Sequence, residues 1–202
     1  MSNTKEKILY AALDLFAREG YSAASVRDIA AQLGITKGAL YRHYPSKRAI
    51  LEAIVERMEQ RDRENARAHA LPERAIADAP EGYGRTAPED FAAFALEMFR
   101  YWTEDPFAAA FRRMLALERY RDPEMAVLHA QYLSTGPLEY TQDLFREMME
   151  AGCLRRGDAR AVALEFYGPM YLLMDARDGE GQASSVAELE NCIDRFFAAN
   201  RI

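Results

Sequence analysis

The sequence of 202 residues contains little of what marks several classes of protein. Its two cysteines, Cys153 and Cys192, are far apart and belong to no C-x-x-C motif, which argues against a zinc ribbon or a redox motif. We expect two buried, reduced thiols. No apolar run approaches the ~18 residues that would suggest a membrane span. The residues from Met1 to Glu6 lead directly into an amphipathic pattern without the features of a secretory signal, which predicts a cytoplasmic protein with no membrane partner.

Catalytic and metal-binding patterns are also missing from the sequence. The three histidines, His43, His69 and His129, form no ligand spacing such as H-E-x-x-H, and no Gly-rich phosphate loop is present. We therefore predict neither an enzyme nor a cofactor or metal site. An all-α enzyme whose acid and base are not evident remains an alternative.

Lysine is absent after residue 50, and this uneven distribution says more than the net charge of −6. Residues 1–50 hold eight Lys and Arg against four Asp and Glu, so they carry +4 and leave −10 for the rest. Binding to a nucleic acid depends on neutralising its phosphates. A basic head on an acidic body is therefore expected if only the head meets DNA.

Apolar residues recur at helical spacing throughout the chain, and no segment alternates with a period of two. Ser25, Thr36, Ser46 and Asp158 stand where they would cap helices. Proline directly follows the start of further helices near residues 88, 106 and 123, and Gly136-Pro137 is expected to kink or split the helix that contains it. The sequence predicts an all-α protein of about nine helices, with a flexible loop over 71–87.

Two of these predicted helices are short and close together. The first starts at Ser25 and ends near Gly34, and the second runs from Thr36 to about His43. Two short helices joined by a turn of three or four residues that contains glycine are typical of a helix-turn-helix.

The first fifty residues closely resemble the tetracycline-repressor (TetR) family of transcriptional regulators. The resemblance is carried by Ala12-Leu15-Phe16, Gly20-Tyr21, Ser25–Ala30, Leu33–Tyr44, Lys47 and Leu51, and has a weaker counterpart in Gly168-Pro169-Met170-Tyr171. It implies an all-helical homodimer with a DNA-binding domain at 1–47 and a helical effector-binding and dimerisation domain at 48–202. Such regulators are usually repressors that a small molecule releases from double-stranded operator DNA.

The second helix of a helix-turn-helix enters the major groove, where its N-terminal residues reach base edges. The predicted DNA-binding residues are Ser25, Arg27, Thr36, Lys37, Gly38, Ala39, Tyr41, Arg42, His43 and Lys47. The small Gly38 and Ala39 allow a close approach, and Lys37 contacts either guanine or a phosphate. The resemblance implies that Tyr41 and Lys47 contact phosphates, and Arg27 matches a position that reaches a base in some relatives. Taken singly, the basic residues are also compatible with a solvated surface, and Tyr41 and Tyr44 with core packing, which is favoured over DNA contact for Tyr44.

The body is rich in aromatic residues and methionines, which suit a pocket for a mainly apolar effector. The predicted ligand-binding residues are Phe94, Met98, Trp102, Phe111, Met114, Tyr132 and Phe145. The predicted dimer interface in the last two helices comprises Phe166, Met170, Leu173, Ile193 and Phe196. For both sets the alternative is ordinary core packing.

Two further alternatives concern function. The chain could be a transcriptional activator of the same architecture, or an all-α interaction protein that uses the head to bind protein instead of DNA. The sequence does not reveal the effector, the operator or the regulated genes.

Overall fold

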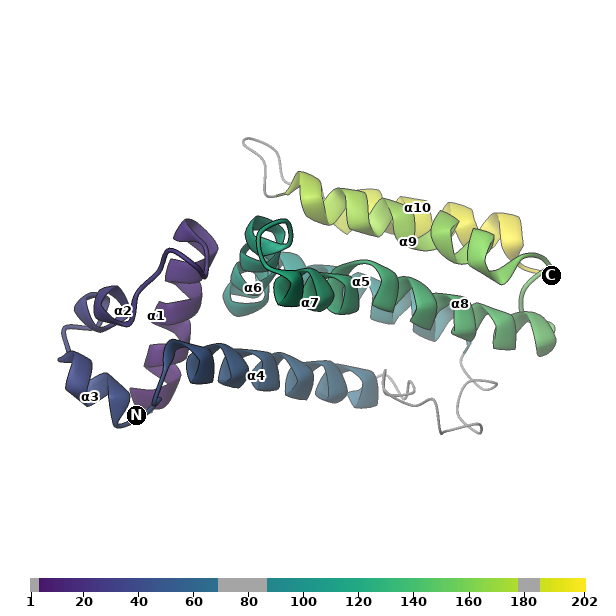
Figure 1. Cartoon of the computed structure of the whole chain (residues 1–202). Coiled ribbons are helices and arrows are strands. Elements are labelled where there is room, and N and C mark those ends of the chain that lie inside the picture. The colour runs from purple at the N-terminus through teal and green to yellow at the C-terminus, as the bar shows by residue number, and fades with distance from the viewer. Residues whose placement is uncertain (1–3, 69–86, 178–185) are drawn as a thin grey trace. The chain divides into compact units, whose positions relative to one another are not determined.

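The computed structural model describes residues 4–68, 87–177 and 186–202, so the predicted loop over 71–87 lies almost wholly outside the described residues. Within them the chain forms ten helices (Figure 1): α1 Thr4–Glu19, α2 Val26–Gln32, α3 Lys37–Tyr41, α4 Lys47–Ala68, α5 Pro88–Glu104, α6 Pro106–Glu118, α7 Pro123–Leu133, α8 Thr135–Glu150, α9 Ala159–Ala176 and α10 Val186–Asn200. The only β-structure among these residues is an isolated bridge between Leu154 and Arg201. The all-α prediction is confirmed.

The helix starts follow from local chemistry. Pro88, Pro106 and Pro123 are the first residues of α5, α6 and α7, where a missing backbone N–H costs nothing. Asp158 caps α9, because its Oδ1 accepts hydrogen bonds from the backbone N–H groups of Arg160 and Ala161 at 2.9 and 3.3 Å. The predicted split near Gly136-Pro137 occurs two residues earlier, at Ser134, and it turns the expected nine helices into ten.

The described residues pack as two compact units. The first combines residues up to Arg61 with 106–129, and the second combines 62–105 with 130–202. Both α4 and α7 therefore contribute to each unit. These units do not coincide with the predicted functional domains 1–47 and 48–202, whose boundary stays a prediction.

The first unit is held together by α1 and α6 together with the first half of α4. Tyr10 and Phe107 meet edge to face, with their ring centroids 5.0 Å apart. The Arg57 guanidinium lies 5.0 Å from the Tyr10 ring and 4.8 Å from the Phe107 ring, and it also binds Glu6 at 3.1 Å. This arginine therefore joins α4 to both partner helices.

The second unit has a core of four phenylalanines, one from each of α5, α8, α9 and α10. Phe166 lies at its centre, with its ring centroid 5.0 to 5.3 Å from those of Phe91, Phe145 and Phe196. All four side chains are buried. Edge-to-face and offset stacking of this kind adds to the stabilisation from burial alone.

Within the described residues, no helix has the length and apolarity needed to cross a bilayer, and no cluster of His, Cys, Asp or Glu could hold a metal ion.

The prediction of two buried thiols is wrong, because Cys192 is exposed and Cys153 is half-buried. Cys192 lies on α10, where the buried positions are Leu189, Ile193 and Phe196.

Candidate nucleic-acid interface

Helices α2 and α3 form the predicted helix-turn-helix. The Ser25 Oγ accepts a hydrogen bond from the backbone N–H of Asp28 at 3.2 Å, and the Asp28 carboxylate accepts one from the backbone N–H of Ser25 at 3.3 Å. This reciprocal pair is a capping box, which fixes where α2 begins. At the other end, Gly34 has a φ of +64°, the left-handed conformation that glycine adopts without strain.

Helix α3 is only five residues long, and Thr36 fixes its start. The Thr36 Oγ1 accepts a hydrogen bond from the backbone N–H of Ala39 at 3.1 Å. Leu40 is fully buried, so it anchors the helix in the core. A Cβ added at Gly38 would contact only the Thr36 Oγ1, at 4.0 Å. The packing of the chain itself therefore does not require glycine at this position.

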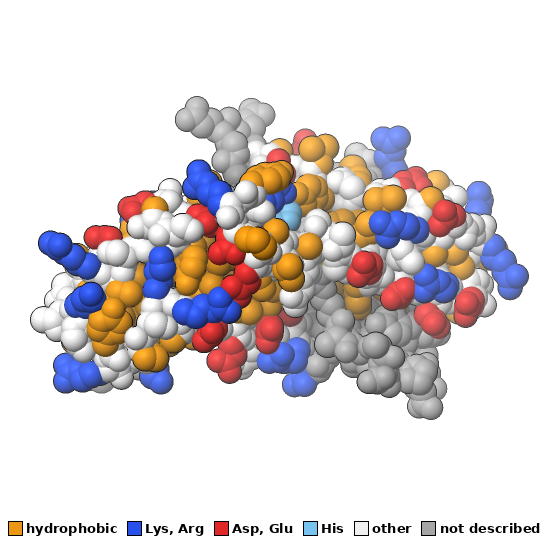
Figure 2. Space-filling model, viewed as in Figure 1, with side chains coloured by type: hydrophobic (Ala, Val, Ile, Leu, Met, Phe, Trp, Pro, Cys, Tyr) orange, Lys and Arg blue, Asp and Glu red, His pale blue; other side chains and the backbone are white. Residues whose placement is uncertain are grey.

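Most of the predicted DNA-binding residues lie on the surface of this motif. The exposed members are Ser25, Arg27, Thr36, Lys37, Gly38, Tyr41 and Arg42, and the half-buried ones are Ala39, His43 and Lys47. Figure 2 shows blue Lys and Arg side chains around the surface that α2 and α3 form. Helix and cap together thus present cations, hydroxyls and a small residue, the groups that contact phosphates and base edges.

The two aromatic residues of this segment have different environments. Tyr41 is 39% exposed, and the Lys37 Nζ lies 5.5 Å from the centroid of its ring. Tyr44 is buried, as expected for core packing, and this burial raises the pKa of its hydroxyl above the usual value. Tyr41 is therefore the tyrosine of this pair whose ring a nucleic acid can reach.

Lys47 lies in a site that sequence reasoning did not foresee. Its Nζ donates hydrogen bonds to the backbone carbonyls of Tyr21, Ser22 and Ala24, at 2.7, 3.3 and 2.9 Å. Burial lowers the pKa of this ammonium, and the charge of Glu118 partly opposes the shift. An ammonium has three N–H donors, so these carbonyls occupy all of them. The phosphate contact predicted for Lys47 would require it to give up one of these bonds.

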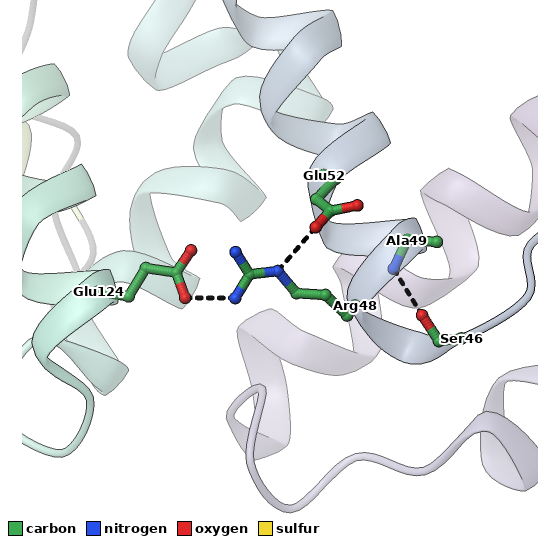
Figure 3. Close-up of polar contacts among 5 residues, drawn as sticks. All are labelled: Ser46, Arg48, Ala49, Glu52 and Glu124. Carbon is green, nitrogen blue, oxygen red and sulfur yellow. Dashed lines mark hydrogen bonds and ion pairs between the residues drawn. The ribbon is translucent and has the colours of Figure 1, made fainter.

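Arg48, the next residue along α4, joins α4 to α7 within the first unit (Figure 3). Its Nε donates to Glu52 at 2.9 Å and its Nη1 to Glu124 at 2.5 Å, and these hydrogen bonds raise the pKa of the guanidinium. Figure 3 also shows Ser46, which caps α4 through the backbone N–H of Ala49 at 3.0 Å. The Arg48 guanidinium is therefore engaged in contacts within the protein.

An open depression of about 250 Å³ lies beside this ion pair. It is lined by residues of α4 and α7, namely Arg48, Leu51, Glu52, Val55, Glu56, Glu59, Glu124 and Leu128. Four of the eight are glutamates, which repel phosphate groups. The depression is therefore poorly suited to binding a nucleic acid, in contrast to the exposed face of α2 and α3.

The predicted ligand-binding residues do not gather at one described cavity. Phe111 and Met114 belong to the first unit and the other five to the second, and none of the seven lines the depression beside Arg48. Trp102 and Tyr132 are both buried and meet edge to face, with their centroids 6.4 Å apart. Phe145 belongs to the phenylalanine cluster, while Phe94 and Met98 on α5 are half-buried.

The predicted dimer interface stays a prediction, but most of its residues already pack within the chain. Phe166, Met170, Ile193 and Phe196 are buried within the second unit, so they leave little side chain for a partner to contact, and Leu173 is half-buried. Sequence periodicity identified the apolar side of each helix but not which apolar residues face outward. The exposed apolar residues of α9 are instead Leu164 and Leu172.

Comparison with known proteins agrees with this geometry. Residues 8–54 match the family described as "Bacterial regulatory proteins, tetR family". A 56-residue segment is 41% identical to the uncharacterized HTH-type transcriptional regulator YerO of Bacillus subtilis. That segment covers 28% of this chain and only 19% of YerO, so the likeness is confined to about a fifth of the relative.

Solved structures extend the likeness to the whole fold. The TetR-family regulator PfmR of Thermus thermophilus is 26% identical, with a TM-score of 0.64 over 95% of this chain and 97% of its own. SmeT, the repressor of a Stenotrophomonas maltophilia multidrug efflux pump, has also been solved in complex with triclosan. In that complex it is 21% identical to this chain, with a TM-score of 0.69 over 98% of this chain and 92% of its own.

Proposed function

This chain belongs to the tetR family of bacterial regulatory proteins through its helix-turn-helix domain, and we propose that it is a homodimeric repressor released from a palindromic operator by a small, mainly apolar molecule. The coarser role, that of a transcriptional regulator that binds DNA, is shared with its relatives. The repression, the effector and the dimer are the proposal. A two-fold dimer would place its recognition helices ~34–36 Å apart, or a multiple of that, which matches a palindromic operator.

The observation that carries the proposal is the exposed face of α3. Leu40 anchors this helix in the core, while Lys37 and Tyr41 remain accessible on its other side. The residues between them include Gly38, which the chain's own packing does not require. A short helix with a buried anchor and a small, cationic outer face is suited to the major groove.

Selection of bound sequences from random double-stranded DNA tests this role. We expect an enriched, two-fold symmetric sequence, and Lys37→Ala should then bind it more weakly. Arg156→Ala is the matched control, because Arg156 is an exposed arginine in the second unit. If no sequence is enriched, DNA recognition is refuted and the head is better interpreted as a protein-binding module.

The exposed side of α9 supports the dimer. Leu164 is 51% exposed and Leu172 is 66% exposed, and both lie one helical repeat from the exposed Gly168. A Cβ at Gly168 would meet nothing within 4 Å, so a partner helix could approach closely there. Such an apolar stripe with a small residue at its centre is suited to an isologous contact between two copies.

Light scattering after size exclusion tests the dimer. We expect Leu172→Asp to convert it to a monomer, because the carboxylate would be buried without a partner charge. Val127→Asp is the control, since Val127 is 65% exposed and lies on α7. A dimer that survives Leu172→Asp, or one that Val127→Asp disrupts equally, refutes this interface.

A small-molecule effector is supported by the fold shared with SmeT, which binds triclosan. Thermal-shift screening of hydrophobic compounds should find one that stabilises the protein, and the same compound should weaken operator binding by about 5- to 150-fold. The absence of any stabiliser among diverse compounds would count against an apolar effector. Reporter output in a deletion strain then distinguishes a repressor from an activator.

A further inference from the structure

The loop of residues 20–25, which joins α1 to α2, is held by side chains from two other helices. Lys47 on α4 donates to three of its carbonyls, as described above, and its Nζ also lies 4.5 Å from the centroid of the Tyr21 ring. The other contact comes from Glu118, the last residue of α6. All of these residues belong to the first compact unit.

The Glu118 carboxylate fits closely against this loop. Its Oε2 accepts a hydrogen bond from the Ser22 Oγ at 3.1 Å, across a separation of 96 residues. Its Oε1 lies so near Gly20 that a Cβ added there would be 2.2 Å from it. Gly20 also has a φ of +89°, which an L side chain rarely adopts. Two constraints therefore favour glycine at position 20, namely the positive φ of the backbone and the lack of space for a Cβ.

Burying the Glu118 carboxylate is unfavourable for the free energy of folding. Glu118 is fully buried, and its Oε1 has no hydrogen-bond partner among the described residues. It stands at the C-terminal end of α6, where the helix dipole disfavours a negative charge. The Arg121 Nη1 is 4.0 Å away, but that side chain is 68% exposed. The charge of Lys47 and the Ser22 hydroxyl offset part of this cost, but a buried Oε1 without a hydrogen bond remains, and such departures are expected at functional positions.

The loop sets the position of the reading helices. It ends at Ser25, the cap of α2, and α2 and α3 together span only residues 26–41. Two short helices joined by one turn move together when the first of them is displaced. A change in how α6 holds the loop is therefore expected to displace α3 relative to α1.

We propose that Glu118 is a positioning residue for DNA recognition, which fixes the 20–25 loop through Ser22. This inference rests on the proposed function. Glu118 does not contact DNA itself. It acts through the loop, which Lys47 also holds.

A double-mutant cycle on the selected operator tests the proposal. We expect Ser22→Ala and Glu118→Ala each to weaken binding about tenfold, and the double variant to bind no more weakly than Glu118→Ala alone. Glu118→Gln keeps an oxygen that can accept the Ser22 hydrogen bond, so it should recover most of the affinity. Glu139→Ala, an exposed glutamate on α8, is the matched control and should bind as the original chain does.

The measurement must separate positioning from folding. Affinity is therefore determined by anisotropy well below the melting temperature of each variant, together with its dependence on salt. A purely structural role would lower the melting temperature but leave both quantities unchanged for the folded protein. Unchanged affinity in Ser22→Ala, or strictly additive losses in the double variant, would overturn the proposal.

A second readout keeps the proposal testable if the chain binds no DNA. Hydrogen exchange of the amides in residues 20–33 should be faster in Ser22→Ala and Glu118→Ala than in Glu139→Ala. Equal protection in all three would refute the positioning role independently of the operator. Failure of DNA selection combined with faster exchange would refute the proposed function and leave only the structural part of this inference.

Discussion

The two compact units differ in whether the residues predicted to bind a ligand are exposed or buried. In the first, the residues predicted to meet DNA are mostly exposed on α2 and α3, and buried polar groups such as Glu118 hold the framework behind them. In the second, the aromatic residues that suggested an effector pocket are largely buried, and one of them, Phe145, belongs to the cluster of four phenylalanines. A surface for DNA can thus be recognised without its ligand, whereas a pocket made from core residues cannot.

This difference between the two units would disappear if the phenylalanine cluster were not tightly packed. We expect Phe166→Ala to lower the free energy of unfolding by about 3–5 kcal/mol, because it removes a ring that contacts three others. Chemical denaturation measures this change. A loss below about 1 kcal/mol would indicate a loosely filled cavity, and Phe145 would then again be a strong candidate for an effector contact.

The next largest effect separates two lysines of the first unit. Lys37→Ala should weaken operator binding by about 1–3 kcal/mol and leave the melting temperature unchanged, because Lys37 is exposed. Lys47→Ala should lower stability by about 1–3 kcal/mol, because three carbonyls lose their donor. Anisotropy and thermal denaturation of both variants give the comparison. Equal melting temperatures for the two variants would contradict a framework role for Lys47.

Local chemistry explains how much could be predicted from the sequence. The caps at Ser25, Thr36 and Asp158 depend on residues two or three positions away, and all were predicted. The Ser22–Glu118 contact joins residues 96 positions apart, and no periodicity encodes it. The steric reason for glycine at position 20 is hidden for the same reason, because Glu118 is 98 positions away in the sequence.

The body shows a second limit. Helical periodicity placed Phe166 and Phe196 on the apolar sides of their helices, and the sequence predicted a dimer interface with core packing as the alternative, because apolar sides can meet within one chain or across two copies. The structure assigns both residues to the chain's own core and leaves Leu164 and Leu172 outside. The proposed interface changed for this reason, while the all-α fold, which depends only on periodicity, was confirmed.

A smaller effect tests whether the stability of the helix-turn-helix depends on the cap of α2. Ser25→Ala should cost about 1 kcal/mol of stability, since it removes the acceptor for the Asp28 N–H and half of the capping box. Thermal denaturation of this variant, with Ser46→Ala as a second cap for comparison, measures the effect. No change in Ser25→Ala would mean that the framework behind α2, and not its own cap, fixes the start of that helix.

The smallest effect belongs to the second unit and concerns pH. A hydrogen bond from its own backbone, and then one from Arg201, lower the pKa of Glu89 below the usual 4.5. The carboxylate therefore stabilises the fold above pH 4.5, and this contribution is lost as the pH falls through the lowered pKa. Glu89→Gln should melt slightly earlier than the original chain at pH 7, and the difference should vanish in acid. Because the ion pair with Arg201 is exposed, added salt should also reduce the difference. A difference that persists in acid would show that Glu89 stabilises the fold through packing and not through its ion pair. Apolar contacts would then account for the stability of the second unit even at this exposed position.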